Sequence, residues 1–236
     1  MTAYTATTPS TPIRSPRGWL AAPAVAGLAF VAAWVTGLLV WPSNLDLAAP
    51  DARVVSTYAG HQGVAIAQYL LVEGLAAIAL AIVVLALGRT ARRRGARRLG
   101  AVVMLVGIGA VTISLAECAL GLRLTSIVAA DDKAARAGTL FDLINRLDGV
   151  KMLALAAVAL AGVGLRRGTG LLPRWLDYVA VLLAAAMIAS GVGYLLLNNS
   201  LSQAAAVSLA LLLVWVAATG MTLGRRSGDA ASRPPE

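Results

Sequence analysis

Carboxyl groups interrupt the apolar stretches of this 236-residue chain, and they are the first candidates for chemistry. Glu73 and Glu117 each lie inside a long hydrophobic run. The fourth apolar run of the chain opens with FDLINRLDGVK, residues 141–151, which contains Asp142, Asn145, Arg146, Asp148 and Lys151. A carboxyl group held away from water can hold a proton at working pH or act as a general acid. Ionisable residues are rare inside apolar segments, where they mark candidate functional sites.

The charged residues of segment 141–151 are spaced to pair with one another on a helix. Asp142 and Arg146 are four residues apart, and Asp148 and Lys151 are three apart. Residues at these spacings are neighbours on a helix surface, so we expect two internal ion pairs. A charged side chain at the centre of a membrane span costs about 2.5–3.5 kcal/mol, and pairing offsets part of that cost.

Glu73 and Glu117 have no opposite charge within their own runs. They must therefore be protonated, face water, or meet Arg146 or Lys151 from the fourth run. The last choice predicts one charged seam shared by three neighbouring helices. The predicted pocket for a ligand or for protons is lined by Gln68, Tyr69, Glu73, Ser114, Glu117, Asp142, Asn145, Arg146, Asp148 and Lys151.

An alternative interpretation places residues 139–149 at the membrane surface as an amphipathic turn. The span would then begin near Met152, and only Glu73 and Glu117 would lie within the membrane. The remaining stretch, 152–165, is too short to cross a bilayer without the polar turn, which favours the seam. The seam itself is open to two interpretations: a binding site, or a network that only fixes helix register.

The composition places these residues in a membrane protein. The chain is 59% hydrophobic and 13% charged, whereas soluble domains carry about 25% charged residues. Six apolar runs are long enough to cross a bilayer, so we predict an all-α, polytopic bundle of six helices. The expected spans are 19–41, 64–87, 99–122, 140–165, 175–197 and 203–223. Residues 1–18 and 224–236 are expected to be disordered cytoplasmic tails.

The basic residues predict how the bundle is oriented. The connection 88–100 carries six arginines and 166–174 carries three, and both tails are basic as well. With six spans these segments fall on one side, which the positive-inside rule assigns to the cytoplasm. Both termini are therefore predicted to be cytoplasmic and the charged pocket to face outward, in the cytoplasmic (inner) membrane of a bacterium. Because the formal net charge of +9 is confined to such loops, nucleic acid is rejected as a partner, and membrane lipids are expected instead.

Several chemistries are excluded by residue counts. There is one cysteine, Cys118, and one histidine, His61, so an intrachain disulfide, a cysteine cluster and a bis-histidine haem site are ruled out within the chain. The sequence contains no HExxH motif and no Ser–His–Asp arrangement that would support hydrolysis. We expect no metal and no cofactor.

Three functions remain open. The first is the binding or transport of a small polar or cationic ligand, or of protons; because six helices are few for a self-contained transporter, transport would need a homo-oligomer or a membrane partner subunit. The second is an intramembrane enzyme of cyclase type acting on a lipid-like or isoprenoid substrate, with Glu73 and either Asp142 or Asp148 as the acid and the cation stabiliser. Only 5% of the residues are aromatic, which weighs against carbocation chemistry. The third is a non-catalytic accessory or structural subunit.

The chain resembles small six-helix bacterial membrane proteins of unknown function. The resemblance covers the number of apolar runs, the arginines of the loops and the polar start of the fourth run, LINRLDGVK. It implies a multi-pass membrane protein and assigns no catalytic residue.

Overall fold

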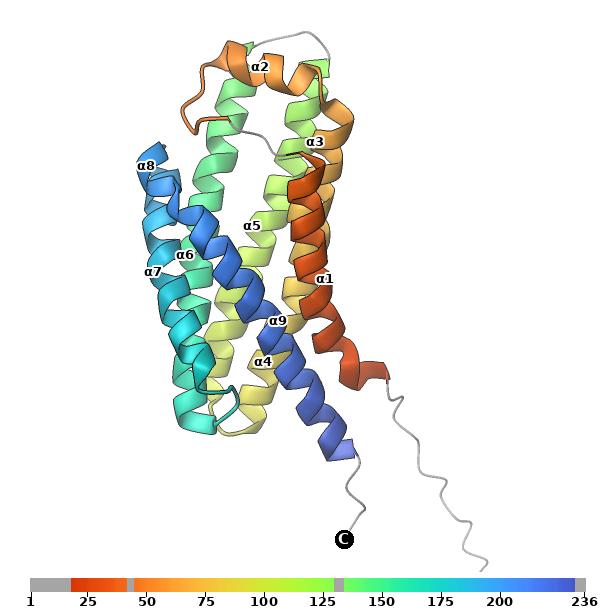
Figure 1. The fold of residues 1–236 in the computed structure, drawn as a ribbon, viewed down its shortest axis with the longest axis vertical. Coiled ribbons are helices and arrows are strands. Elements are labelled where there is room, and N and C mark those ends of the chain that lie inside the picture. Colours follow the sequence, from red (N-terminus) through yellow and green to blue (C-terminus); the bar gives the residue numbers. More distant parts are fainter. Residues whose placement is uncertain (1–17, 42–44, 130–133, 232–236) are drawn as a thin grey trace, which may run out of the picture.

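The computed structural model describes residues 18–41, 45–129 and 134–231. Most of the expected N-terminal tail, and residues 232–236 of the expected C-terminal tail, lie outside these ranges. The described residues form helices and their connections and contain no strand (Figure 1). The helices are α1 (Gly18–Val40), α2 (Asp51–Ala59), α3 (Gln62–Tyr69), η1 (Leu70–Leu75), α4 (Ala76–Arg93), α5 (Arg97–Ala129), α6 (Ala134–Thr169), α7 (Trp175–Leu195), α8 (Asn199–Ser202) and α9 (Ala204–Ala231).

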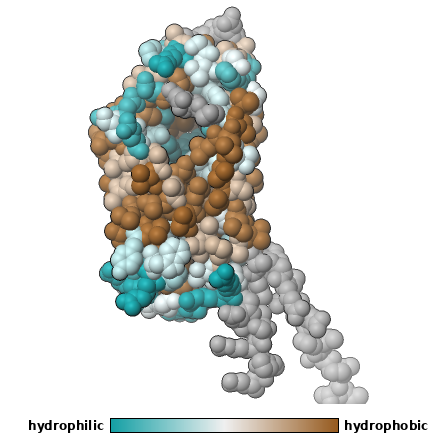
Figure 2. All heavy atoms as spheres, viewed as in Figure 1, coloured by the Kyte–Doolittle hydropathy of each residue, from teal (hydrophilic) through white to brown (hydrophobic). Residues whose placement is uncertain are grey.

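The predicted all-α bundle of six long apolar helices is confirmed. Six helical units are long and apolar enough to cross a membrane: α1, the continuous unit α3–η1–α4, α5, α6, α7 and α9. Large aliphatic side chains such as Leu39, Leu105 and Leu182 are exposed on the outside of the bundle. Figure 2 shows the result as a broad apolar band between two polar ends. Such a surface is more stable in contact with lipid hydrocarbon than with water, because contact between water and a large apolar area is unfavourable.

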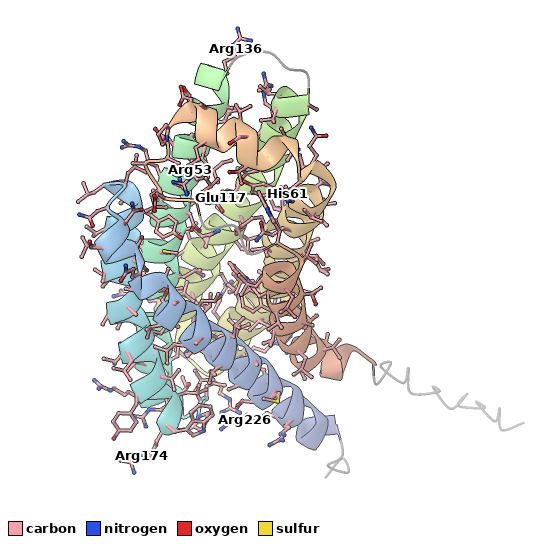
Figure 3. All side chains as sticks on the ribbon, turned by 45° about the horizontal axis from the view of Figure 1, so that its top comes forward. Arg53, His61, Glu117, Arg136, Arg174 and Arg226 are labelled. Atoms are coloured by element: carbon pink, nitrogen blue, oxygen red, sulfur yellow. The ribbon has the colours of Figure 1, made fainter. Side chains whose placement is uncertain are left out.

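The two ends of the bundle differ in what connects the helices. At one end, here called the basic end, the connections α4–α5 and α6–α7 carry arginines, and Figure 3 places Arg174 and Arg226 there. At the other end, the capped end, α2 lies across the tops of the long helices (Figure 1). Gly138 of α6 permits this crossing, since a Cβ atom built there would lie 1.7 Å from Oδ1 of Asp51 in α2.

Helices α5, α6 and α9 extend beyond the spans expected from hydropathy. Helix α5 has 33 residues and α6 has 36, which at about 1.5 Å per residue gives roughly 50 Å, well over a hydrocarbon core of about 30 Å. Residues 139–149 thus belong to one unbroken helix rather than to a separate turn. Helix α9 likewise continues to Ala231, past the end expected at residue 223.

Helices α1 and α9 form a V that matters for the site. They touch near the basic end, where a Cβ atom on Gly220 would lie 2.4 Å from the carbonyl oxygen of Pro23, and one on Gly27 would lie 3.1 Å from that of Val216. Small residues allow this close approach of helix backbones in lipid. Towards the capped end the two helices diverge (Figure 1).

Candidate functional site

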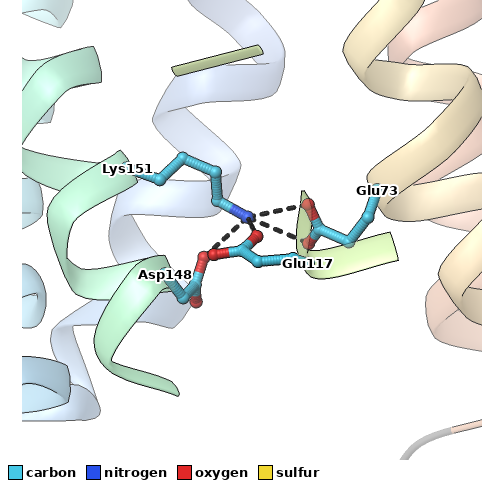
Figure 4. A network of polar contacts seen from close by, with 4 residues as sticks. All are labelled: Glu73, Glu117, Asp148 and Lys151. Carbon is cyan, nitrogen blue, oxygen red and sulfur yellow. Dashed lines mark hydrogen bonds and ion pairs between the residues drawn. The ribbon is translucent and has the colours of Figure 1, made fainter. Parts of the chain in front are cut away.

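Four charged side chains from three helical units meet inside the bundle (Figure 4). The ammonium of Lys151 in α6 donates to both carboxylate oxygens of Glu73, at 2.9 and 2.8 Å, and to Oε2 of Glu117 in α5, at 2.5 Å. It also pairs with Oδ1 of Asp148, one turn earlier on α6, at 2.7 Å. We call Glu73, Glu117, Asp148 and Lys151 the charged cluster. The expectation that both glutamates meet a base from the fourth span is confirmed, and the base is Lys151.

The charged cluster is well shielded from solvent. The side chains of Glu117 and Lys151 are 1% and 6% exposed, and those of Glu73 and Asp148 are 12% and 21% exposed. With every group ionised, three carboxylates face one ammonium, which leaves two formal negative charges in excess. Buried charge that lacks a counter-charge is costly. We therefore expect protons or a bound cation to neutralise the excess negative charge of the cluster.

One carboxylate oxygen of the charged cluster lacks a partner. Oε1 of Glu117 is buried and makes no hydrogen bond in the described part of the chain, although Oε2 of the same group bonds Lys151. Leaving a buried acceptor unsatisfied costs about 1–3 kcal/mol. This oxygen can therefore accept one further hydrogen bond.

The backbone around Glu73 departs from the α-helix. Residues Leu70–Leu75 form a π-helical turn between α3 and α4. Such turns are rare and are often found at functional sites, because the extra residue changes the direction of side chains within the helix. This turn was not predicted from the sequence, since neither a proline nor a glycine pair marks it.

Aromatic side chains pack together on the side of Glu73 that faces the capped end. The hydroxyl groups of Tyr69 and Tyr58 lie 2.9 Å apart, and the ring of Tyr58 meets that of Trp41 edge-on at 4.8 Å. Gly121 of α5 leaves room for Tyr69, because a Cβ atom there would lie 2.4 Å from the tyrosine ring. Burial raises the pKa of the Tyr58 phenol, and the hydrogen bond with Tyr69 offsets part of this rise.

Amide side chains fasten the connection between α1 and α2 over the site. The side chain of Gln68 donates to the carbonyl of Trp41 at 3.0 Å, and that of Asn145 donates to the carbonyl of Leu47 at 3.4 Å. The backbone N–H of Leu47 in turn donates to the side chain of Asn199 at 2.9 Å. These hydrogen bonds join segments that are far apart in the sequence at the capped end. We call the part of the α1–α2 connection that contains Trp41 and Leu47 the roof of the site.

Two cavities adjoin the charged cluster. The upper cavity, of about 230 Å³, lies under the roof, and its polar lining includes Tyr58, Gln68, Tyr69, Glu73 and Asn145. The lower cavity, of about 470 Å³, has a mainly apolar lining that includes Leu38, Met152, Leu155, Met187, Leu209 and Leu212, with Lys151 at its polar edge. Trp34, Asp148 and Tyr194 line both cavities. Figure 2 shows the corresponding face hollowed near the capped end.

The residues chosen from the sequence divide into two groups. Gln68, Tyr69, Glu73, Glu117, Asn145, Asp148 and Lys151 belong to the charged cluster or the upper cavity. Ser114 is buried on α5 but makes no hydrogen bond to another described residue. Asp142 is half-buried and Arg146 is exposed, and the ion pair expected between them is absent from the described part of the chain. Trp34, Tyr58, Tyr194 and Ser208 also line the cavities, but they were not predicted from hydropathy and spacing. For Tyr194, the available signal was a phenol near the end of an apolar run.

The carboxylates of the charged cluster also have the geometry of a cation site. Glu73, Glu117 and Asp148 each offer a ligand atom, and these atoms lie within 4.8 Å of one another. The Lys151 ammonium contacts all three carboxylates, so it occupies the place that a bound cation would take. A competing cation therefore has to displace Lys151 or share its carboxylates.

Comparison with known proteins leaves the site to be interpreted on its geometry. No protein-family model matches the chain, no curated protein matches it, and no solved structure matches it. The structural findings support a multi-pass integral membrane protein with a buried charged cluster between two cavities.

Proposed function

We propose that this protein binds a small ligand carrying positive charge, in a pocket that faces the extracytoplasmic side of a bacterial cytoplasmic membrane. The observation that carries the proposal is the excess of carboxylates over ammonium groups in the charged cluster, at the junction of two cavities. Protons and the ligand compete for the same carboxylates, so binding is coupled to proton release. The arginine-rich basic end and both termini are assigned to the cytoplasm.

The unpartnered oxygen of Glu117 supports a ligand more than a purely structural network. A network that only fixes helix register is most stable when each buried polar atom has a partner. Here Oε1 of Glu117 has none among the described residues, while Lys151 is shared among three carboxylates. A cationic donor would satisfy that oxygen and reduce the negative excess.

Acid catalysis on an isoprenoid substrate ranks second. Asp148 borders the mainly apolar lower cavity, which favours this alternative. Against it, Asp142 stands outside the charged cluster, and Glu73 accepts hydrogen bonds from Lys151 on both oxygens. Among the lower cavity's lining residues, only Trp34 and Tyr194 are aromatic, which is little stabilisation for a carbocation.

The proposal is tested by binding measurements on the full chain in lipid nanodiscs. The probes are ethylammonium, the neutral ethanol and the anionic acetate, and the readouts are calorimetry and the shift in thermal unfolding. We expect ethylammonium alone to bind, and Glu117→Gln to weaken its binding at least tenfold. Proton release on binding is measured from the dependence of the heat on buffer ionisation.

Asp142→Asn provides the matched control. It removes a half-buried carboxylate from α6 outside the charged cluster, so ethylammonium binding should be unchanged. Equal responses to the cation, the neutral probe and the anion, or equal binding by wild type and Glu117→Gln, would overturn the proposal and leave the structural role.

A further inference from the structure

The lower cavity combines a charged edge with a mainly apolar interior. Asp148, Lys151, Tyr194 and Ser208 provide its polar groups. The rest of the lining comes from aliphatic, methionine and tryptophan side chains of α1, α6, α7 and α9. Its volume of about 470 Å³ falls in the range of sites for small organic ligands, about 300–1,000 Å³. A simple inorganic cation would leave most of this space unfilled.

The mouth of the lower cavity lies between α1 and α9. Leu38 of α1 lines the cavity and is 41% exposed, and Ala206 of α9 lines it and is also exposed. A residue that both lines a cavity and is exposed lies at its opening. The V between the two helices, closed near Gly27 and Gly220, places this opening towards the capped end (Figure 1). The surface around the mouth is apolar, as Leu39 and Val207 show with exposures of 78% and 59%.

From this arrangement, and resting on the proposed function, we infer that the ligand is an amphipathic amine. Its cationic head lies at the charged cluster and its hydrocarbon chain fills the lower cavity. It enters from the membrane between α1 and α9. Charge complementarity selects the head group, because an anionic head would add to the two negative charges already in excess.

Tyr194 supports the position of the head group. It lines both cavities, and its hydroxyl group makes no hydrogen bond to another described residue. A phenolic oxygen can accept a hydrogen bond from an ammonium group and can donate one to a carboxylate. The head group would thus lie where the two cavities meet, between Tyr194 and Asp148.

The experiment compares decylammonium with ethylammonium in the same nanodiscs. Ala205→Phe fills part of the lower cavity, since Ala205 belongs to its lining. Ala210→Phe adds the same ring to an exposed position of α9 that does not line the cavity. We expect Ala205→Phe to weaken decylammonium binding at least tenfold, because each excluded methylene is worth about a factor of four. Ethylammonium binding should be unchanged in Ala210→Phe, and Ala205→Phe should weaken it far less than it weakens decylammonium binding.

Competition by decanol and decanoate distinguishes recognition of the ammonium head group from nonspecific entry of an alkyl chain into the mouth of the cavity. We expect neither to compete with decylammonium in the wild type. The inference is overturned if decanol competes equally well, or if Ala205→Phe and Ala210→Phe bind decylammonium alike. The proposed function survives that result as long as ethylammonium binds, and it fails separately if ethylammonium does not.

Mass spectrometry of the purified protein identifies the source of the amine. An amine-headed membrane lipid retained by the wild type and lost from Ala205→Phe supports a lipid ligand. A wild type that retains no lipid but binds decylammonium supports a free amphipathic amine. A retained lipid that is equally abundant in both proteins counts against the inference.

Discussion

The ammonium of Lys151 lies 2.5 Å from Oε2 of Glu117, although the two residues are 34 positions apart in the sequence. The same ammonium holds Glu73 from a third helical unit. One lysine thereby links α5, α6 and the π-helical turn in the interior of the bundle. Its removal would leave three carboxylates facing one another.

The first prediction concerns the unequal roles of Lys151 and Glu117. Lys151→Met should destabilise the protein by about 3–5 kcal/mol, because it leaves uncompensated buried charge. Glu117→Gln should cost less, since Lys151 keeps Glu73 and Asp148 as partners. The double variant should be more stable than Lys151→Met alone. Unfolding measurements on all four proteins give the coupling free energy, and additive effects would contradict a shared network.

The second prediction concerns orientation in the membrane. In a Cys118→Ala background, Ser56→Cys introduces an exposed thiol in α2 at the capped end, and Gly168→Cys introduces one at the basic end. A Cβ atom at Gly168 meets nothing within 4 Å, so this substitution is well tolerated. A membrane-impermeant maleimide should label Ser56→Cys in intact cells and Gly168→Cys only after lysis. The reverse pattern would place the basic end outside.

The fold was largely predictable from the sequence, because a membrane-spanning helix is specified by the hydropathy of consecutive residues. Six apolar runs specify six long helices in any arrangement. The partner of Glu73 was predictable only as one of two bases, Arg146 or Lys151. These bases lie five positions apart on α6, which places them on different faces, and the packing of α5 beside α6 brings Lys151 to the glutamates.

The cavities and the π-helical turn were not predictable in the same way. A cavity depends on how helices diverge, and the V of α1 and α9 is set by contacts of Gly27 and Gly220 with residues far away in the sequence. The turn at Leu70–Leu75 depends on one extra residue in the helical ladder, which leaves hydropathy unaltered. Tyr58 joins the site only because α2 folds across the capped end.

The third prediction concerns the pH dependence contributed by Tyr58. Its folded-state pKa is raised by burial, so the folded protein keeps this proton at pH values where the unfolded chain loses it. The stabilisation is therefore complete below pH of about 10, the usual tyrosine pKa, and is lost as pH rises through the folded-state value. Tyr58→Phe should cost about 1 kcal/mol at pH 8 through the lost bond to Tyr69.

Unfolding of wild type and Tyr58→Phe between pH 8 and 11 measures this contribution. The difference in stability between the two proteins should narrow as the pH rises, because phenylalanine has no proton to lose. Tyr178→Phe is the control, since Tyr178 is 75% exposed on α7. A difference that stays constant up to pH 11 would contradict the role assigned to burial of Tyr58.

The last prediction concerns the helix contact that positions Asp148 and Lys151. Gly149 lies between them on α6, and a Cβ atom there would be 2.7 Å from the carbonyl oxygen of Gly191 in α7. Gly149→Ala should destabilise the protein by about 1–3 kcal/mol, since backbone atoms cannot yield as a flexible side chain does. Gly109→Ala on α5 should be neutral or stabilising, because nothing lies within 4 Å and alanine favours the helix by about 1 kcal/mol. If α6 moves away from α7 to relieve the clash, ethylammonium binding should weaken in Gly149→Ala but not in Gly109→Ala. Equal stability and equal binding of the two variants, measured by thermal unfolding and calorimetry, would show that the α6–α7 contact does not position the charged cluster.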